Sequence, residues 1–161
     1  MIRQSRLDRR FAFCVLLLCM NLVFIWGNSL LPGNISALLS LDVKLWLLEV
    51  FPGLSVVTGE SGHHLVRKWA HFLEFCCLGA CLRCLARLQK KTPLRQHLLP
   101  WVWGVLAACA DETIQCFVPD RGPALKDVGI DTLGVTLGVG IISLIYLCKA
   151  KKQCNLEETE K

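Results

Sequence analysis

The stretch of sequence that decides the fold is residues 68–88, KWAHFLEFCCLGACLRCLARL. It is as long as the roughly 20 mostly apolar residues that a helix needs to cross a bilayer. It also carries His71 and Glu74 near its start. Ionisable side chains inside a membrane usually face the interior of a helix bundle, because contact with lipid is costly. The stretch therefore predicts a membrane-spanning helix with one polar face turned toward other helices.

Apolar stretches of similar length lie on both sides of this one. They cover residues 11–31, 98–118 and 127–147. Of the 161 residues, 53% are hydrophobic, which is a higher share than a soluble domain usually has. The sequence thus predicts an all-α integral membrane protein with four transmembrane helices. Its parts are an N-terminal segment at residues 1–10, one membrane domain at residues 11–148 and a charged tail at residues 149–161.

The connection between the first two spans contains a further helical stretch, residues 36–51. It is rich in leucine and valine but carries Asp42, Lys44 and Glu49. Its length is below what a comfortable crossing requires. A stretch that mixes apolar and charged residues in this way is typical of helices that lie in the membrane interface. We therefore predict an interfacial or re-entrant helix in the first outer loop.

The placement of Lys and Arg predicts the orientation. Four spans put both termini and the loop between spans two and three on one side of the membrane. That side holds most of the basic residues: Arg3, Arg6, Arg9, Arg10, Arg83, Arg87, Lys90, Lys91, Arg95, Lys149, Lys151, Lys152 and Lys161. The other side holds fewer, namely Lys44, Arg67, Lys68, Arg121 and Lys126. Because cytoplasmic loops carry the excess of positive charge, both termini are expected in the cytoplasm.

Composition argues against two other classes of protein. The net charge of +5 comes from residues that flank apolar segments, without the interleaved aromatic residues of a nucleic-acid-binding surface, so no nucleic-acid partner is expected. Ten cysteines are typical of a small secreted disulfide scaffold. Most of these cysteines lie inside apolar runs, where cysteine acts as a small hydrophobic residue.

The polar residues of three spans are expected to meet in one layer near the outer face. His71 and Glu74 lie early in a span that runs inward, Asp111 lies late in a span that runs outward, and Asp131 lies early in the next inward span. Residues four apart share one face of a helix. The catalytic candidates are His71, Glu74, Asp111 and Glu112, and the substrate-binding candidates are Arg67, Lys68, Gln115, Arg121, Asp127 and Asp131.

Three interpretations of this layer remain open. It is a structural ion-pair network, or a site in which His71 is a general base oriented by Glu74, or a divalent-cation site that adds Asp111 and Asp131. The cation site is disfavoured because nearby Arg and Lys side chains would compete for the carboxylates. We therefore expect no metal and no cofactor. In span four, Gly134 and Gly138 share a face that lets another helix approach closely.

Two sequence motifs resemble those of VanZ-like proteins. Residues 67–75, RKWAHFLEF, resemble the family stretch R-K-x-A-H-F-x-E-Y, with Phe75 in place of the usual tyrosine. Residues 111–121, DETIQCFVPDR, followed by residues 127–134, DVGIDTLG, are similar to the second family signature. Asp120 stands where glycine is common in the family. The order, the spacing and the placement on spans two to four all fit.

The resemblance implies a four-helix integral protein of the bacterial cell membrane. The founding member of the family is associated with low-level resistance to teicoplanin, so the resemblance also implies an effect on glycopeptide susceptibility. Two functions are favoured at this point over a third, transport, for which four helices in one chain would need to oligomerise. The first is an enzyme whose polar site near the outer leaflet acts on a lipid-linked or cell-surface substrate. The second is a non-catalytic envelope modulator that binds lipid, a cell-wall precursor or a lipophilic antibiotic such as a lipoglycopeptide.

Overall fold

The computed structural model describes residues 2–53, 62–89, 92–122 and 124–159. These residues form five helices and no strand, which confirms the predicted all-α class. The helices are α1 (Ile2–Ser29), α2 (Gly33–Val50), α3 (Gly62–Leu88), α4 (Pro93–Gln115) and α5 (Leu125–Thr159).

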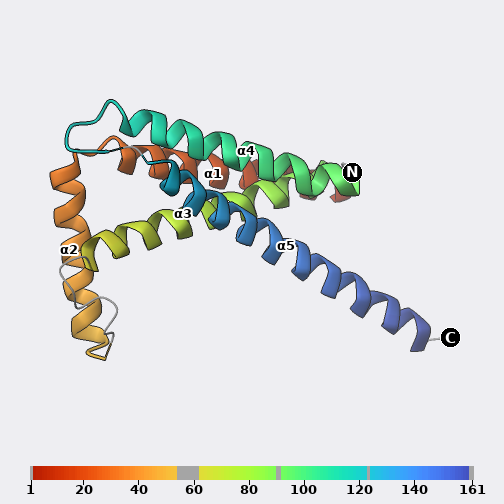
Figure 1. Cartoon of the computed structure of the whole chain (residues 1–161). Coiled ribbons are helices and arrows are strands. Elements are labelled where there is room, and N and C mark those ends of the chain that lie inside the picture. Colours follow the sequence, from red (N-terminus) through yellow and green to blue (C-terminus); the bar gives the residue numbers. More distant parts are fainter. Residues whose placement is uncertain (1, 54–61, 90–91, 123, 160–161) are drawn as a thin grey trace.

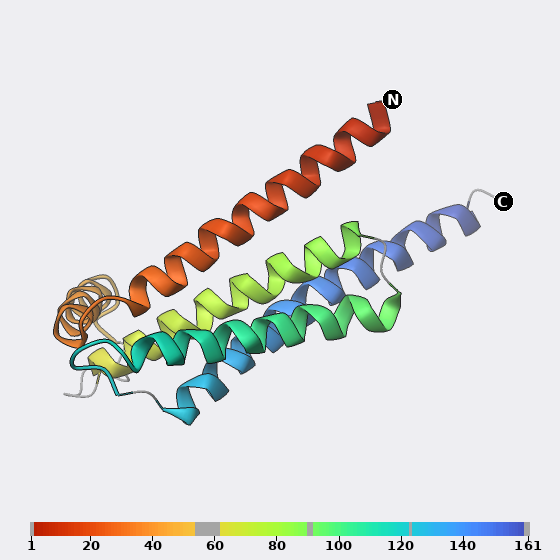
Figure 2. The same ribbon diagram turned by 90° about the horizontal axis from the view of Figure 1, so that it is seen from above.

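Four of the helices run along the bundle and the fifth lies across one end of it. Figure 1 shows α2 crossing the end at which α1 and α4 finish and α3 and α5 begin. The N-terminus and the C-terminus both lie toward the opposite end (Figures 1 and 2). Because α3 contacts each of the other four helices, it is the central element of the fold. The stretch quoted first from the sequence is therefore the one on which the bundle is built.

Three helices are long and apolar enough to cross a membrane. The qualifying segments are Leu7–Ser29 in α1, His64–Leu88 in α3 and Leu125–Leu156 in α5. The chain is thus a membrane protein with at least three candidate spans in its described part. Helix α4 is not among them, because polar residues toward its two ends, such as Arg95 and Glu112, lower its hydropathy. The helix also starts earlier than the predicted span, so Pro100 lies in its interior.

The tightest contact in the bundle joins α3 to α5 through glycines. A side chain on Gly134 or Gly138 of α5 would collide with the backbone oxygens of Phe72 and Cys76 in α3. A side chain on Gly79 of α3 would meet the backbone oxygen of Val135. The close approach expected from the spacing of the two α5 glycines is therefore present. It matters because membrane helices associate mainly through packing.

Helix α2 turns its polar stripe inward and its apolar side outward. Ser36, Ser40 and Lys44 recur every four residues and are buried, while Leu45 and Trp46 are more than half exposed. The buried stripe lies on a helix that contacts α3. The helix expected at residues 36–51 is therefore present as Gly33–Val50, and its outward face has the apolar character of a lipid-facing surface.

Candidate functional site

Polar side chains of α3, α4 and α5 meet at the α2 end of the bundle. The two most deeply buried are Asp111, which is 0% exposed, and Asp131, which is 1% exposed. Glu112 and Gln115 are also buried, at 7% each. Three helices thus bring together the polar residues whose convergence was predicted from their depth in the membrane and their position around each helix.

His71, Asp111 and Asp131 form the centre of this cluster. His71 Nδ1 lies 3.8 Å from Asp111 Oδ2. Gln115 Nε2 donates a hydrogen bond of 2.8 Å to the same oxygen and thereby fixes the carboxylate of Asp111. One ligand-type atom from each of His71, Asp111 and Asp131 lies within 4.8 Å of the other two. The three atoms come from three different helices, so their proximity is a property of the tertiary fold.

Glu74 has a different partner from the one that its sequence position predicts. Asn28 Nδ2 of α1 donates a hydrogen bond of 2.9 Å to Glu74 Oε1. Asn21 Nδ2 donates to the backbone oxygen of Glu74 at 3.4 Å. The carboxylate within ion-pair distance of His71 is that of Asp111. The expected pairing of His71 with Glu74 is therefore replaced by two separate pairs, one with α4 and one with α1.

The basic residues of the cluster are held in two ways. Lys68 Nζ of α3 forms an ion pair of 2.9 Å with Asp127 Oδ1 in the first turn of α5. Arg121 lies between α4 and α5, and its guanidinium donates from Nε to the backbone oxygen of Leu31 at 3.2 Å and from Nη2 to that of Asn28 at 2.8 Å. Burial, together with the like charge of Arg67, lowers the pKa of the Arg121 guanidinium.

Two of the candidate residues bridge elements of the fold. Glu112 Oε2 accepts a hydrogen bond of 3.0 Å from the backbone N–H of Ala124, one residue before α5 begins. Gln115 Nε2 donates to Ser29 Oγ at 3.3 Å in addition to its bond with Asp111. Glu112 therefore positions the start of α5, and Gln115 ties α4 to the end of α1.

The loop after α4 is seated against the first turn of α2. The backbone N–H of Gly33 donates to the backbone oxygen of Pro119 at 3.0 Å. A side chain at Gly33 would collide with the backbone of Asp120. Asp120 itself has a φ of 58°, a left-handed conformation that aspartate tolerates better than most residues. Glycine would adopt this conformation without the steric cost that other residues pay.

Four buried polar atoms of the cluster have no hydrogen-bond partner among the described residues. They are Glu74 Oε2, Asp111 Oδ1, Arg121 Nη1 and Asp131 Oδ2. A cavity of about 20 Å³ also lies here, lined by residues that include Lys68, His71 and Asp131. More than about 90% of buried polar groups in native structures are paired. These four atoms are therefore available to a ligand or to water, which makes the cluster the candidate site.

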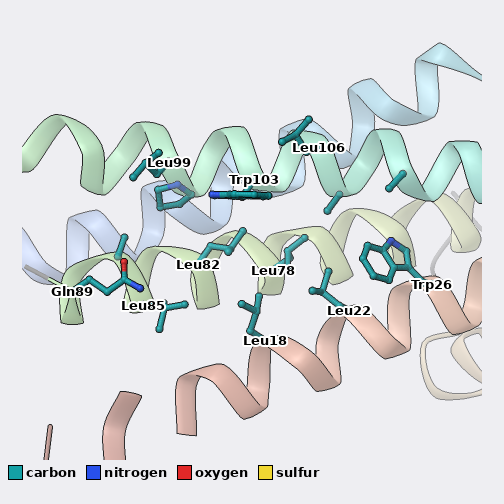
Figure 3. Close-up of a pocket in the computed structure, with 14 residues that line it drawn as sticks. Leu18, Leu22, Trp26, Leu78, Leu82, Leu85, Gln89, Leu99, Trp103 and Leu106 are labelled. Carbon is teal, nitrogen blue, oxygen red and sulfur yellow. The ribbon is translucent and has the colours of Figure 1, made fainter. Parts of the chain in front are cut away.

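An apolar groove approaches this cluster between α1, α3 and α4 (Figure 3). Its volume is about 510 Å³, within the ~300–1,000 Å³ typical of ligand pockets. Figure 3 shows Trp26 at one end and Gln89 at the other. At the Trp26 end, the lining residue Ala110 directly precedes Asp111, and Leu78 lies one helical turn from Glu74. The groove therefore ends within one turn of the polar cluster.

The contribution of α1 to the site is absent from the sequence-based prediction. Asn21, Asn28 and Ser29 supply hydrogen-bond partners for Glu74 and Gln115. Asn21 and Asn28 are seven residues apart and so lie on one face of the helix. That spacing, in an otherwise apolar span, is the signal by which the sequence could have revealed them.

Comparison with known protein families gives a match over most of the chain. The family model for VanZ/LLP1 matches residues 11–146, which is most of the chain and includes every site residue described above. Neither the curated proteins nor the solved structures include a match. The two motifs around the cluster and the family match agree, and the chain therefore belongs to the VanZ/LLP1 family.

Proposed function

We propose that this protein is an enzyme of the bacterial cell membrane that acts on the headgroup of a lipid-linked or cell-surface substrate. The observation that carries the proposal is the set of unpaired buried atoms of Glu74, Asp111, Arg121 and Asp131 at the end of an apolar groove. A structural ion-pair network would satisfy its own donors and acceptors. Unpaired atoms beside an apolar groove suit a ligand with a polar head and an apolar tail.

The proposed topology places this site at the outer leaflet. Helix α4 contacts α1, α3 and α5 along the bundle, and we take it as a fourth crossing. Four crossings put both termini on one side, and the excess of basic residues assigns that side to the cytoplasm. The cluster then faces the cell exterior, where glycopeptide antibiotics and cell-wall precursors meet the membrane. An effect on teicoplanin susceptibility is consistent with this position.

The groove and the basic residues together support the proposed class of substrate. From Leu78 to Gln89, α3 rises roughly 16 Å, about half of the ~30 Å hydrocarbon thickness. An apolar tail that entered at the outer leaflet would run along this length. Arg67, Lys68 and Arg121 lie at the cluster, where they would hold an anionic headgroup such as a phosphate.

Glu74 is the best candidate for proton transfer. Asn28 holds its Oε1, while its Oε2 is buried and has no partner among the described residues. A carboxylate with one fixed and one unpaired oxygen is oriented toward a reacting group without being neutralised by a salt bridge. We propose that Glu74 accepts the proton of a water molecule that attacks an ester of the headgroup, and that it returns this proton to the alcohol that leaves as the ester bond breaks. The Arg121 guanidinium would stabilise the negative charge that develops on the headgroup.

The Glu74→Gln variant is expected to fold and to lose function. Glutamine keeps the shape and the acceptor for Asn28 but removes the proton acceptor, so turnover should fall by roughly 100-fold or more. The measurement is teicoplanin susceptibility and envelope lipid composition in cells that express equal amounts of folded protein. Glu49→Gln, an identical change at an exposed position of α2, is the matched control and should behave like the wild type.

A second function, binding without catalysis, is favoured by one observation. The outward face of α2 presents Leu45 and Trp46 to the surroundings. If that face binds a lipid or a lipophilic antibiotic, Trp46→Ser should abolish the phenotype while Glu74→Gln retains it. That pattern would replace the catalytic proposal by the binding one.

Filling the groove is expected to expel the bound tail. Ala107 lines the groove on α4, and phenylalanine at this position would occupy the space between α1 and α3. The Ala107→Phe variant should purify without the lipid that the wild type retains, as measured by native mass spectrometry of the protein in mild detergent. Cys109→Phe places the same ring at an exposed position outside the groove and should leave lipid retention unchanged. Equal lipid retention by the wild type and Ala107→Phe would rule out the groove as the tail site.

A further inference from the structure

Three side chains at the centre of the cluster have the identity and spacing of metal ligands. One nitrogen of His71 and one carboxylate oxygen each of Asp111 and Asp131 lie within 4.8 Å of one another. His71 Nδ1 and Asp111 Oδ2 are 3.8 Å apart. Ligands bound to one cation at ~2.0–2.2 Å are at most about 4 Å apart. Small side-chain rotations would therefore bring all three atoms onto one ion.

The burial of the two carboxylates is the second observation. Asp111 is 0% exposed and Asp131 is 1% exposed, and they come from neighbouring helices. Asp111 Oδ1 and Asp131 Oδ2 are buried and have no hydrogen-bond partner among the described residues. Two neighbouring buried carboxylates repel each other unless a proton or a cation lies between them. Each carboxylate therefore keeps one oxygen available to a cation.

Two of the basic side chains near these carboxylates have other partners. Lys68 is engaged by Asp127, at the outer edge of the cluster. Arg121 donates from Nε and Nη2 to the backbone oxygens of Leu31 and Asn28. Asp131 has no basic partner within ion-pair distance in the part of the chain that the structure describes. Lys68 and two of the donors of Arg121 therefore have partners other than Asp111 and Asp131, while Arg121 Nη1 has none among the described residues.

We propose that His71, Asp111 and Asp131 bind one divalent transition-metal cation. An imidazole nitrogen with two carboxylate oxygens suits Mn²⁺ or Zn²⁺ better than Mg²⁺ or Ca²⁺, which prefer oxygen ligands alone. Gln115 supports the site from outside, because its hydrogen bond to Asp111 Oδ2 orients that carboxylate. Three protein ligands leave coordination positions open toward the small cavity beside His71.

The metal site deepens the proposed function without depending on it. Within the proposed enzyme, the open positions of the cation would take an oxygen of the anionic headgroup, and Glu74 would remain the proton acceptor. Binding of the cation rests only on the three ligands, so it can be measured without knowledge of the substrate.

The test is a Mn²⁺ titration of the full chain in detergent micelles, purified without a histidine tag and stripped with EDTA. Mn²⁺ is the probe because it binds thiolates weakly. Zn²⁺ would also bind to the thiolates of the ten cysteines. Electron paramagnetic resonance reports the free ion. The wild type is expected to bind one Mn²⁺ per chain. The Asp131→Asn variant should bind it roughly 100-fold more weakly, since loss of even a supporting partner costs ~10–100-fold.

The matched control is Asp42→Asn, the same change at an exposed position of α2. It should bind Mn²⁺ like the wild type. Thermal unfolding of each variant shows that it is folded before titration. Absence of Mn²⁺ binding by the wild type, or equal binding by Asp131→Asn, would overturn the metal site and indicate carboxylates that share a proton. If Glu74→Gln still lost the phenotype in that case, the proposed function would stand while the metal site fell.

Discussion

Replacing Gly138 with alanine is expected to destabilise the membrane domain by on the order of 1–3 kcal/mol. A methyl group at this position would collide with the backbone oxygen of Cys76 and crowd the backbone nitrogen of Ala80. Backbone atoms cannot rotate away as a long side chain does, so α3 and α5 would have to separate. That separation would weaken the tightest contact in the bundle and pull His71 away from Asp131. Unfolding in a titration of SDS against mild detergent measures the change.

Gly140→Ala is the matched control for this experiment. Position 140 lies on the same helix, and nothing lies within 4 Å of a side chain built there. Alanine is a better helix former than glycine, by ~1 kcal/mol in a helix interior. The control should therefore be neutral or slightly more stable than the wild type. Equal stability of Gly138→Ala and Gly140→Ala would show that the two helices are not in close contact.

Arg121→Lys is expected to cost about 1.5–3 kcal/mol of stability and to release the loop after α4. The guanidinium spans two backbone oxygens, those of Asn28 and Leu31, at the end of α1. Lysine keeps the charge but is a single point donor without the planar fork of arginine, so at least one oxygen loses its partner. Because Asn28 also holds Glu74, the loss should disturb the site as well as the fold.

Arg95→Lys, at an exposed position of α4, controls for the chemistry of the change and should leave stability within about 0.5 kcal/mol of the wild type. The SDS titration used for the glycine variants measures both proteins. Protease accessibility of the loop at residues 116–122 gives an independent readout. An Arg121→Lys variant with wild-type stability and a protected loop would contradict the tie between the loop and α1.

The convergence of the polar residues was predictable because depth and helical phase are properties of sequence. Alternating span direction places His71, Asp111 and Asp131 at one level, and spacing by four places each on an inward face. The close approach at Gly138 follows from the same reasoning, since small residues on one stripe permit it. The motifs 67–75 and 111–121 identified the family, and the match over residues 11–146 confirmed it.

The pairing within the cluster could not be derived in this way. His71 and Glu74 are three residues apart on one helix, which makes them neighbours on its surface. The partner of each depends on how α3 is rotated about its axis and on which side chains α1 and α4 place opposite it. Asp111 therefore takes the place that sequence reasoning gave to Glu74. Asn28 donates a hydrogen bond to Glu74 because α1 packs against α3. The apolar character of the first span does not reveal this contact.

Two further features could not be predicted from the sequence, namely the groove and the exclusion of α4 from the candidate spans. A groove exists where the side chains of three helices do not fill the space between them. The sequence alone does not distinguish a leucine that lines the groove from a leucine in the core. Helix α4 falls outside the apolar spans because the residues that build the site lower its hydropathy. The same polar residues thus mark the function and obscure the topology.

The length of α5 has a mechanical consequence at the other end of the molecule. The helix has 35 residues, so it rises roughly 50 Å, against a hydrocarbon thickness of ~30 Å. If the helix is close to perpendicular to the membrane, it extends about 20 Å beyond the lipid. Lys149, Lys151 and Lys152 are exposed on this extension. Lysines close to an anionic leaflet each contribute about 1 kcal/mol of attraction. A helical extension of fixed length with such charges sets the distance from the membrane surface, and the angle, at which this end of the chain contacts another molecule.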